Sequence, residues 1–160
     1  MTFKKSIGIL IVTLAVCETK AFAYQQTESP SVRTRSKKGV PGPVEFITPE
    51  ELKAKIAKNE PVAIIDVRAT SGLAEADNKI KGAVYVKLRR LKSRLMMPPL
   101  KDVPRDREVV TYCACPNDEA SIRAAEVLQS AGFSRVRVLK GGWVNWKKIK
   151  GQVEPLAKVL

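Results

Sequence analysis

The chain has 160 residues, a formal net charge of +13 and no histidine. Its length suits one domain with a sizeable core, and its charge indicates a surface that attracts anions. The absence of histidine excludes Cys/His zinc sites and histidine-based catalysis, and three cysteines are too few for a disulfide framework.

The first 23 residues have the pattern of a secretory signal peptide. Lys4 and Lys5 precede an apolar run, Ile7–Val16, and the segment ends in Ala21-Phe22-Ala23. We therefore expect an exported protein, periplasmic or secreted. The apolar run is too short to span a bilayer, so no stable membrane span is expected in the mature chain. An uncleaved anchor and lipidation at Cys17 are the alternatives, and the bulky Val16 disfavours lipidation.

Removing the signal segment, with its net charge of +2, would leave a mature chain near +11. Nucleic acid is one partner for such a surface, but export argues against it. Residues 24–43 are rich in polar, basic and proline residues and are predicted to form a flexible basic linker. The folded domain is expected over residues 44–155, followed by a short tail, 156–160.

The first half of the domain alternates strand and helix patterns. A strand is predicted at 44–47, and a helix follows at 49–58, opened by a capping box formed by Thr48 and Glu51. The apolar run 62–67 suits a strand buried on both faces, and a third strand is predicted at 82–86.

The second half continues the alternation. Leucines spaced three and four apart predict a helix at 87–95 with one apolar and one basic face. A strand at 109–113, a helix at 120–131, a strand at 135–139 and a helix at 143–149 follow. This order indicates an α/β fold with a parallel sheet covered on both faces.

Cys113 ends the predicted strand 109–113 and precedes a helix by a short loop. Loop N–H groups and the positive end of the helix can stabilise a thiolate there without a basic side chain. Ligands of open α/β sheets bind at the carboxyl ends of strands. The segment therefore indicates a cysteine-based active site.

Four stretches in this order resemble the single-domain rhodanese family of sulfurtransferases. They are I-T-P-E-E-L (47–52), I-I-D-V-R (64–68), K-I-K-G-A (79–83), and Y-C-A-C-P-N followed by the helix, strand and G-G-W-V-N-W that close at Trp146. The resemblance implies a three-layer α/β/α domain around a five-stranded parallel sheet. It also implies a cysteine that takes sulfane sulfur from a small donor, holds it as a persulfide and passes it to a thiol acceptor, with no cofactor or metal.

The resemblance leaves two registers for the catalytic cysteine. Alignment by the strand makes Cys113 catalytic, with a loop two residues longer than usual. Alignment by the helix makes Cys115 catalytic, but Pro116 then removes an N–H directly behind the nucleophile. Cys113 is preferred, and Cys115 stays a candidate.

The remaining site residues follow from the same alignment. The active-site loop comprises Ala114, Pro116, Asn117, Asp118, Glu119, Ala120 and Ser121, and the structural residues near it are Asp66, Arg68, Gly141 and Gly142. Asp118 and Glu119 stand where the family often has arginine, so they are expected to disfavour an anionic donor such as thiosulfate.

Two other readings remain open. The chain could be a catalytically weak rhodanese-like binding module, with the acidic, lengthened loop as its supporting feature. The C-x-C pair could instead form a dithiol redox site or a soft-metal site.

Overall fold

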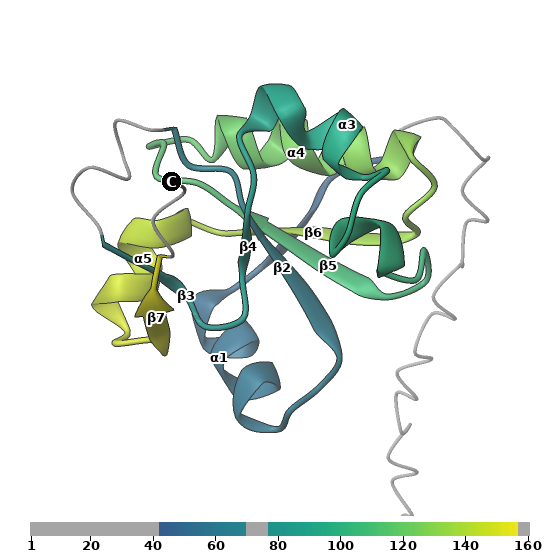
Figure 1. Ribbon diagram of the computed structural model, residues 1–160. Coiled ribbons are helices and arrows are strands. Elements are labelled where there is room, and N and C mark those ends of the chain that lie inside the picture. Colours follow the sequence, from purple (N-terminus) through teal and green to yellow (C-terminus); the bar gives the residue numbers. More distant parts are fainter. Residues whose placement is uncertain (1–41, 70–76, 157–160) are drawn as a thin grey trace, which may run out of the picture. The chain divides into compact units, whose positions relative to one another are not determined.

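The computed structural model describes residues 42–69 and 77–156 (Figure 1). The predicted signal peptide, Cys17, nearly all of the linker and residues 157–160 lie outside this range. The described helices and strands run from Glu45 to Pro155.

A five-stranded parallel sheet forms the centre of the fold. Its order is β1-β6-β5-β2-β4, and every pairing is parallel. The strands are β1 (Glu45–Ile47), β2 (Val62–Asp66), β4 (Val84–Tyr85), β5 (Glu108–Tyr112) and β6 (Arg135–Leu139). All five residues of the central β5 are buried, as both faces of a covered parallel sheet require. The expected five-stranded parallel sheet is confirmed.

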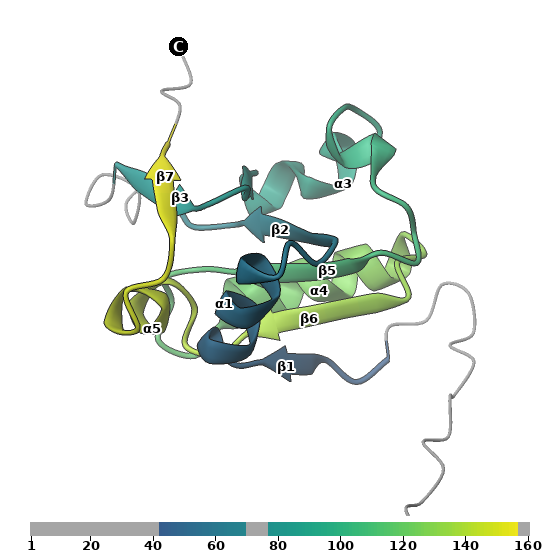
Figure 2. The same ribbon diagram turned by 90° about the horizontal axis from the view of Figure 1, so that it is seen from below.

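Helices cover both faces of this sheet (Figures 1 and 2). One face carries α1 (Pro49–Ala57) and α5 (Gly142–Lys148), which contact each other. The other carries the 3₁₀ turn η1 (Leu88–Arg90), α3 (Leu91–Arg94) and α4 (Glu119–Ser130), which also contact one another. The result is the three-layer α/β/α arrangement.

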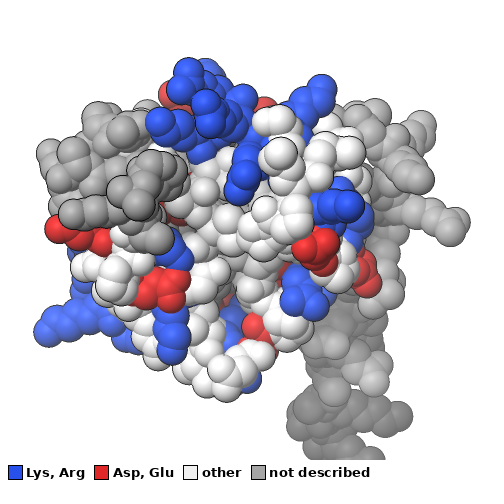
Figure 3. Space-filling model, viewed as in Figure 1, with Lys and Arg blue, Asp and Glu red and all other residues white. Residues whose placement is uncertain are grey.

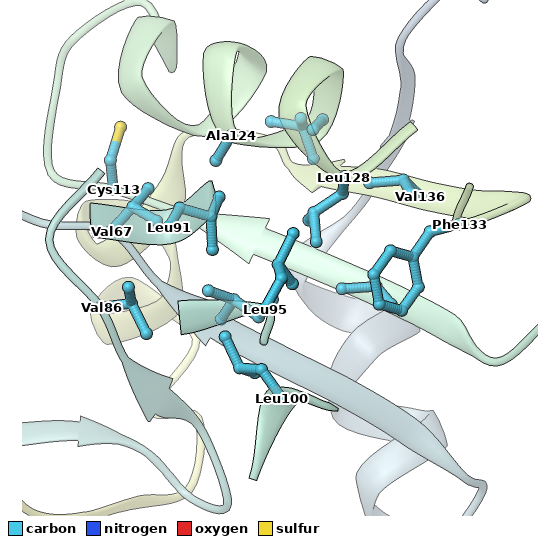
Figure 4. Packing of buried hydrophobic residues seen from close by; sticks show 14 residues of the cluster. Val67, Val86, Leu91, Leu95, Leu100, Cys113, Ala124, Leu128, Phe133 and Val136 are labelled. Atoms are coloured by element: carbon cyan, nitrogen blue, oxygen red, sulfur yellow. The ribbon is translucent and has the colours of Figure 1, made fainter. Parts of the chain in front are cut away.

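Each face has its own apolar core. On the α3/α4 face, Leu91, Leu95, Leu128 and Phe133 pack with Cys113 (Figure 4). On the α1/α5 face, Trp143 and Trp146 pack with the following buried residues: Ile47, Leu52, Ile64, Ile80, Val110, Tyr112 and Leu139. Cys113, which directly follows β5, therefore packs in the core on the α3/α4 face of the sheet.

The N-terminus of α1 is capped as the sequence predicts, but only in one direction. The Thr48 hydroxyl accepts a hydrogen bond from the Glu51 N–H at 3.1 Å. The Glu51 carboxylate turns away to form a double contact with Arg137, at 2.6 and 3.1 Å. A bidentate charged partner is stronger than the single backbone N–H of a capping box.

Three elements differ from the sequence expectation. An antiparallel ribbon pairs β3 (Asn78–Ile80) with β7 (Val153–Pro155), and a 3₁₀ turn, η2, spans Leu100–Asp102. The helix predicted at 87–95 is divided between η1 and the four-residue α3, neither of which has a side-chain cap. Leu91 and Leu95 are nevertheless buried, so the predicted apolar face is present.

Candidate active site

Cys113 lies directly after β5, on the carboxyl edge of the sheet, and none of its surface is exposed. Its carbonyl accepts a hydrogen bond from the Trp143 N–H at 2.8 Å, which ties the strand end to the first turn of α5. Figure 4 shows its side chain pointing toward the first turns of α4. The position is the one predicted for a nucleophile at a strand end.

Two donors converge on the Cys113 sulfur. The Cys115 N–H and the Ser121 hydroxyl each lie 3.3 Å from Sγ. Fixed donors around a buried sulfur stabilise negative charge on it, because they replace the water that burial removes. The loop therefore directs two neutral hydrogen-bond donors at the sulfur of Cys113.

The Ser121 hydroxyl has two partners but one proton. Its oxygen lies 2.9 Å from the Asp118 carbonyl as well as 3.3 Å from Cys113 Sγ. It can donate to the carbonyl and accept from a protonated thiol, or donate to a thiolate. The Thr111 hydroxyl donates to the Ser121 carbonyl at 2.9 Å and helps to fix this first turn of α4 against β5.

Cys115 is half-buried and is a different kind of thiol. Burial raises its pKa, and so do its hydrogen bond with Cys113 and the negative charges of Cys113 and Glu119; the Ala120 N–H acts in the opposite direction. Cys115 is therefore held in its neutral form, while its backbone supports the sulfur of Cys113. Both cysteines are free thiols.

The loop closes on Asp118, which adopts a left-handed conformation with φ of 54° and precedes α4. Its carboxylate is buried and makes no cap to the helix. Instead, Oδ2 accepts from the Gly141 N–H at 2.7 Å, and Oδ1 has no hydrogen-bond partner among the described residues. Asp118 thus fastens the loop to the turn before α5.

The other loop residues differ in how deeply they are buried. Pro116 and Asn117 are exposed, and Ala114 packs at the edge of the α1/α5 core, with Ala120 at the edge of the other. Glu119 is also exposed and pairs with Arg123 at 2.5 Å, one helical turn on. Of the two acidic residues expected at the nucleophile, only Asp118 is turned inward.

Gly142 lets α5 approach the cysteine. Its φ is +43°, and a Cβ there would lie 2.2 Å from the Cys113 carbonyl oxygen and 3.4 Å from Asp118 Oδ1. Only glycine fits at that separation. The structural role predicted for Gly142 is explained by this close approach to the Cys113 carbonyl.

Asp66 and Arg68 form a fully buried ion pair beneath the site, with Arg68 Nη2 2.7 Å from Asp66 Oδ2. The Arg68 side chain also donates to the Asn78 carbonyl at 2.8 Å and stacks over the Trp143 ring at 4.3 Å. The two residues that the sequence analysis assigned a structural role thus contact each other directly.

Tyr112 and Trp143 were not expected to take part in this cluster. The Tyr112 hydroxyl donates to Asp66 Oδ2 at 2.8 Å and accepts from the Ile80 N–H, and burial strongly raises the pKa of Tyr112. In the sequence, both aromatic residues had the signature of ordinary core positions. Their contribution becomes visible only once β2, β5 and α5 are adjacent.

One surface hollow lies away from the cysteines, and neither Cys113 nor Cys115 lines it. A hollow of about 420 Å³ lies at the amino end of the strands, where Lys55, Arg135 and Arg137 surround the buried Glu108. Cys113 itself is fully buried, while Cys115 is partly exposed.

Residues 48–149 match the sequence model of the Rhodanese-like domain. The chain belongs to the rhodanese family. The expected resemblance is confirmed, since the match covers four of the five strands of the parallel sheet, the helices and the cysteine loop.

Relatives of this rhodanese-like chain agree with the assignment. A protein named "Sulfurtransferase" from Allochromatium vinosum is 29% identical over 105 residues, which are 66% of this chain and 90% of that protein. The crystal structure of the Alr3790 protein from Anabaena sp. is 32% identical, with a TM-score of 0.59, over 71% of this chain and 84% of that one.

A thiosulfate sulfurtransferase from Pseudomonas aeruginosa shares the fold. Its TM-score is 0.57 at 22% identity, over 70% of this chain and 20% of that protein. The rhodanese family and the A. vinosum relative together support a function of the sulfurtransferase type.

Proposed function

We propose that this chain is an exported sulfurtransferase that carries sulfane sulfur as a persulfide on Cys113. The observation that supports Cys113 most is the pair of donors, the Cys115 N–H and the Ser121 hydroxyl, aimed at its sulfur. Cys115 is the weaker candidate, because burial and its hydrogen bond with Cys113 raise its pKa.

The chemistry needs two displacements at sulfur. The Cys113 thiolate attacks the sulfane sulfur of a donor, forming Cys113–S–S⁻ and releasing sulfite if the donor is thiosulfate, or a thiolate if the donor is a small persulfide. An acceptor thiolate then attacks the outer sulfur, leaves as a persulfide and regenerates the Cys113 thiolate. The thiolate and the persulfide of Cys113 are both anions, and the Cys115 N–H and the Ser121 hydroxyl can donate to either.

Export is part of the proposal because of the first 23 residues, with their basic start, short apolar run and A-F-A site. Cleavage after Ala23 would remove Cys17 and leave Cys113 and Cys115 as the only thiols. N-terminal sequencing of protein recovered from the cell envelope tests this point. A mature start at Cys17, or an intact Met1 in the cytoplasm, would contradict it.

Peptide mass spectrometry after exposure to a small persulfide donor tests the sulfur chemistry. We expect one added sulfur on the peptide that contains Cys113, none in Cys113→Ser, and a reduced but measurable amount in Cys115→Ser. Asn117→Ala, in the exposed part of the same loop, is the matched control and should load like the wild type. Loading on Cys115 alone would transfer the role to that residue, and thiols inert to every donor would favour a binding module.

A second candidate function is a dithiol that cycles through a Cys113–Cys115 disulfide. The specific observation in its favour is that the Cys115 N–H lies 3.3 Å from the Cys113 sulfur, so the two cysteines are adjacent in the loop. A C-x-C disulfide would be strained and easily reduced. Loss of two hydrogens from the cysteine peptide, in place of a gain of sulfur, would identify this function.

A further inference from the structure

The segment Lys87–Lys101 has an unusual distribution of charge. It contains six cationic residues and no carboxylate: Lys87, Arg89, Arg90, Lys92, Arg94 and Lys101. Among the described residues, none of the six forms an ion pair, whereas lysines and arginines such as Lys55, Arg123 and Arg137 do. Their charge is therefore not neutralised by the protein itself.

The same segment exposes apolar side chains next to these cations. Met96 is 75% exposed and Met97 52%, and Pro98 and Pro99 beside them are exposed too. Leu95 and Leu100, on either side, are buried in the α3/α4 core. The two methionines are thus held outward between two anchored leucines, which is a costly arrangement in water unless something covers them.

We call the segment Lys87–Lys101 the basic methionine tip. Figure 3 shows Lys and Arg side chains gathered along the upper edge of the molecule, over η1 and α3. Pairs of exposed methionines surrounded by unpaired cations combine two attractions, one for apolar chains and one for anions. An anionic phospholipid surface offers both in one plane.

We propose that the basic methionine tip docks on the surface of an anionic phospholipid bilayer. Met96 and Met97 enter the interfacial region, and the surrounding cations meet the lipid phosphates. Six cations fall within the range of basic clusters that bind anionic lipid. The tip contains no aromatic residue on which nucleic-acid bases could stack.

This docking does not depend on the sulfur chemistry. It would, however, fix the orientation of Cys113 relative to the bilayer. Leu91 of α3 and Cys113 belong to the same core, and α3 packs on α4, whose first turn holds Ser121 (Figure 4). A bilayer held against the tip would therefore lie on the same face of the sheet as the helix layer that covers Cys113.

Oxidation of the methionines tests the proposal directly, since Met96 and Met97 are the only methionines besides Met1. The full chain is treated with dilute hydrogen peroxide alone, with neutral phosphatidylcholine vesicles, or with vesicles that contain phosphatidylglycerol. Mass spectrometry then follows the peptide that carries Met96 and Met97. We expect slower oxidation with the anionic vesicles only, and we expect added salt to remove the protection because it screens the charges. Unchanged oxidation on anionic vesicles would overturn the proposal.

Matched pairs of variants separate this surface from general charge and general hydrophobicity. Arg89→Gln/Lys92→Gln should weaken binding to anionic vesicles about 30-fold, at roughly fivefold for each cation. Lys147→Gln/Lys148→Gln, with the same change in charge on exposed residues of α5, should have little effect. Met96→Ser/Met97→Ser should also weaken binding, whereas Val144→Ser/Val153→Ser should not, although both valines are exposed.

Three outcomes would contradict the proposal. Equal weakening by both charge pairs would show that only net charge matters. Protection of Met96 and Met97 by a nucleic-acid duplex but not by vesicles would make the partner a nucleic acid. Protection by an acidic protein alone would make it a protein.

Discussion

At the scale of single residues, the hydrogen bonds to the sulfur of Cys113 come from neutral donors. The backbone of Cys115 and the hydroxyl of Ser121 contact it, and no lysine or arginine in the part of the chain that the structure describes makes a hydrogen bond to it. The same loop holds the buried Asp118 carboxylate, one oxygen of which has no hydrogen-bond partner among the described residues. We expect this negative charge to disfavour an anionic donor, while the two hydrogen bonds favour negative charge on the sulfur.

Asp118→Asn should raise the rate of reaction with thiosulfate several-fold. The amide oxygen can still accept from the Gly141 N–H, while the negative charge that repels the donor is gone. Asp118→Ala leaves that buried N–H without its acceptor and should cost about 1–3 kcal/mol in the free energy of unfolding. Sulfite release and urea unfolding measure the two effects.

Glu119→Gln is the control for this pair. Glu119 is exposed and its charge is already shared with Arg123, so the rate and the stability should change little. If Asp118→Asn reacts no faster than the wild type, the carboxylate does not oppose the donor and our account of the loop is wrong.

The sequence predicted which residues form the loop but not which way they turn. Asp118 and Glu119 are chemically alike and adjacent, yet one is buried and the other lies in solvent. The difference comes from the left-handed backbone at Asp118 and from Gly141, 23 residues away. A local pattern contains neither piece of information.

At the scale of elements, the register of α5 against β5 decides where the cysteine stands. The Trp143 N–H holds the Cys113 carbonyl, and the missing side chain of Gly142 permits that approach. The strand end and the helix start therefore form one unit, although they are about 30 residues apart.

Gly142→Ala should separate the end of β5 from the start of α5. The added methyl group would collide with the Cys113 carbonyl at 2.2 Å, so we expect a loss of persulfide loading and of stability. Gly82→Ala is the matched control, because its φ is also positive, at +76°, but no atom lies within 4 Å of the new Cβ. That variant should lose only the roughly 1–2 kcal/mol of a left-handed residue. Similar unfolding and loading for both variants would show that the Gly142 contact has no special role.

Elements with long, regular patterns were predictable and short ones were not. Strand β5 is recognisable in the sequence as a continuous apolar run, because it is buried along its whole length. Helix α4 is recognisable by its helical periodicity, because only one of its faces is buried. The strands β3 and β7 have three residues each and pair with one another across 72 intervening residues, so no local periodicity marks them. The segment 87–95 kept its apolar face but not its regular helix.

At the scale of the whole molecule, Arg68 connects parts of the chain that are distant in sequence. It pairs with Asp66 at the end of β2, donates to the Asn78 carbonyl in β3 and stacks on Trp143 in α5. Removal of this one side chain would release three attachments and leave a carboxylate buried without its counter-ion.

Arg68→Met should therefore lower the free energy of unfolding by about 3–5 kcal/mol. Asp66→Asn/Arg68→Met removes both charges and should recover part of that loss. Arg123→Met, which breaks an exposed pair, should change stability by less than about 1 kcal/mol. Denaturant unfolding of the three variants provides the comparison, and an Arg68→Met protein as stable as Arg123→Met would contradict the role given to the buried pair.

The pairing of strands has a consequence for the order in which the domain can form during synthesis. Within the described residues, β1 pairs with β6 alone and β3 pairs with β7 alone, so each early strand has its partner late in the domain. Both partners leave the ribosome after most of the domain has been made, so neither early strand can complete its pairing before then. A domain built in this way stays incomplete until its last strand is made.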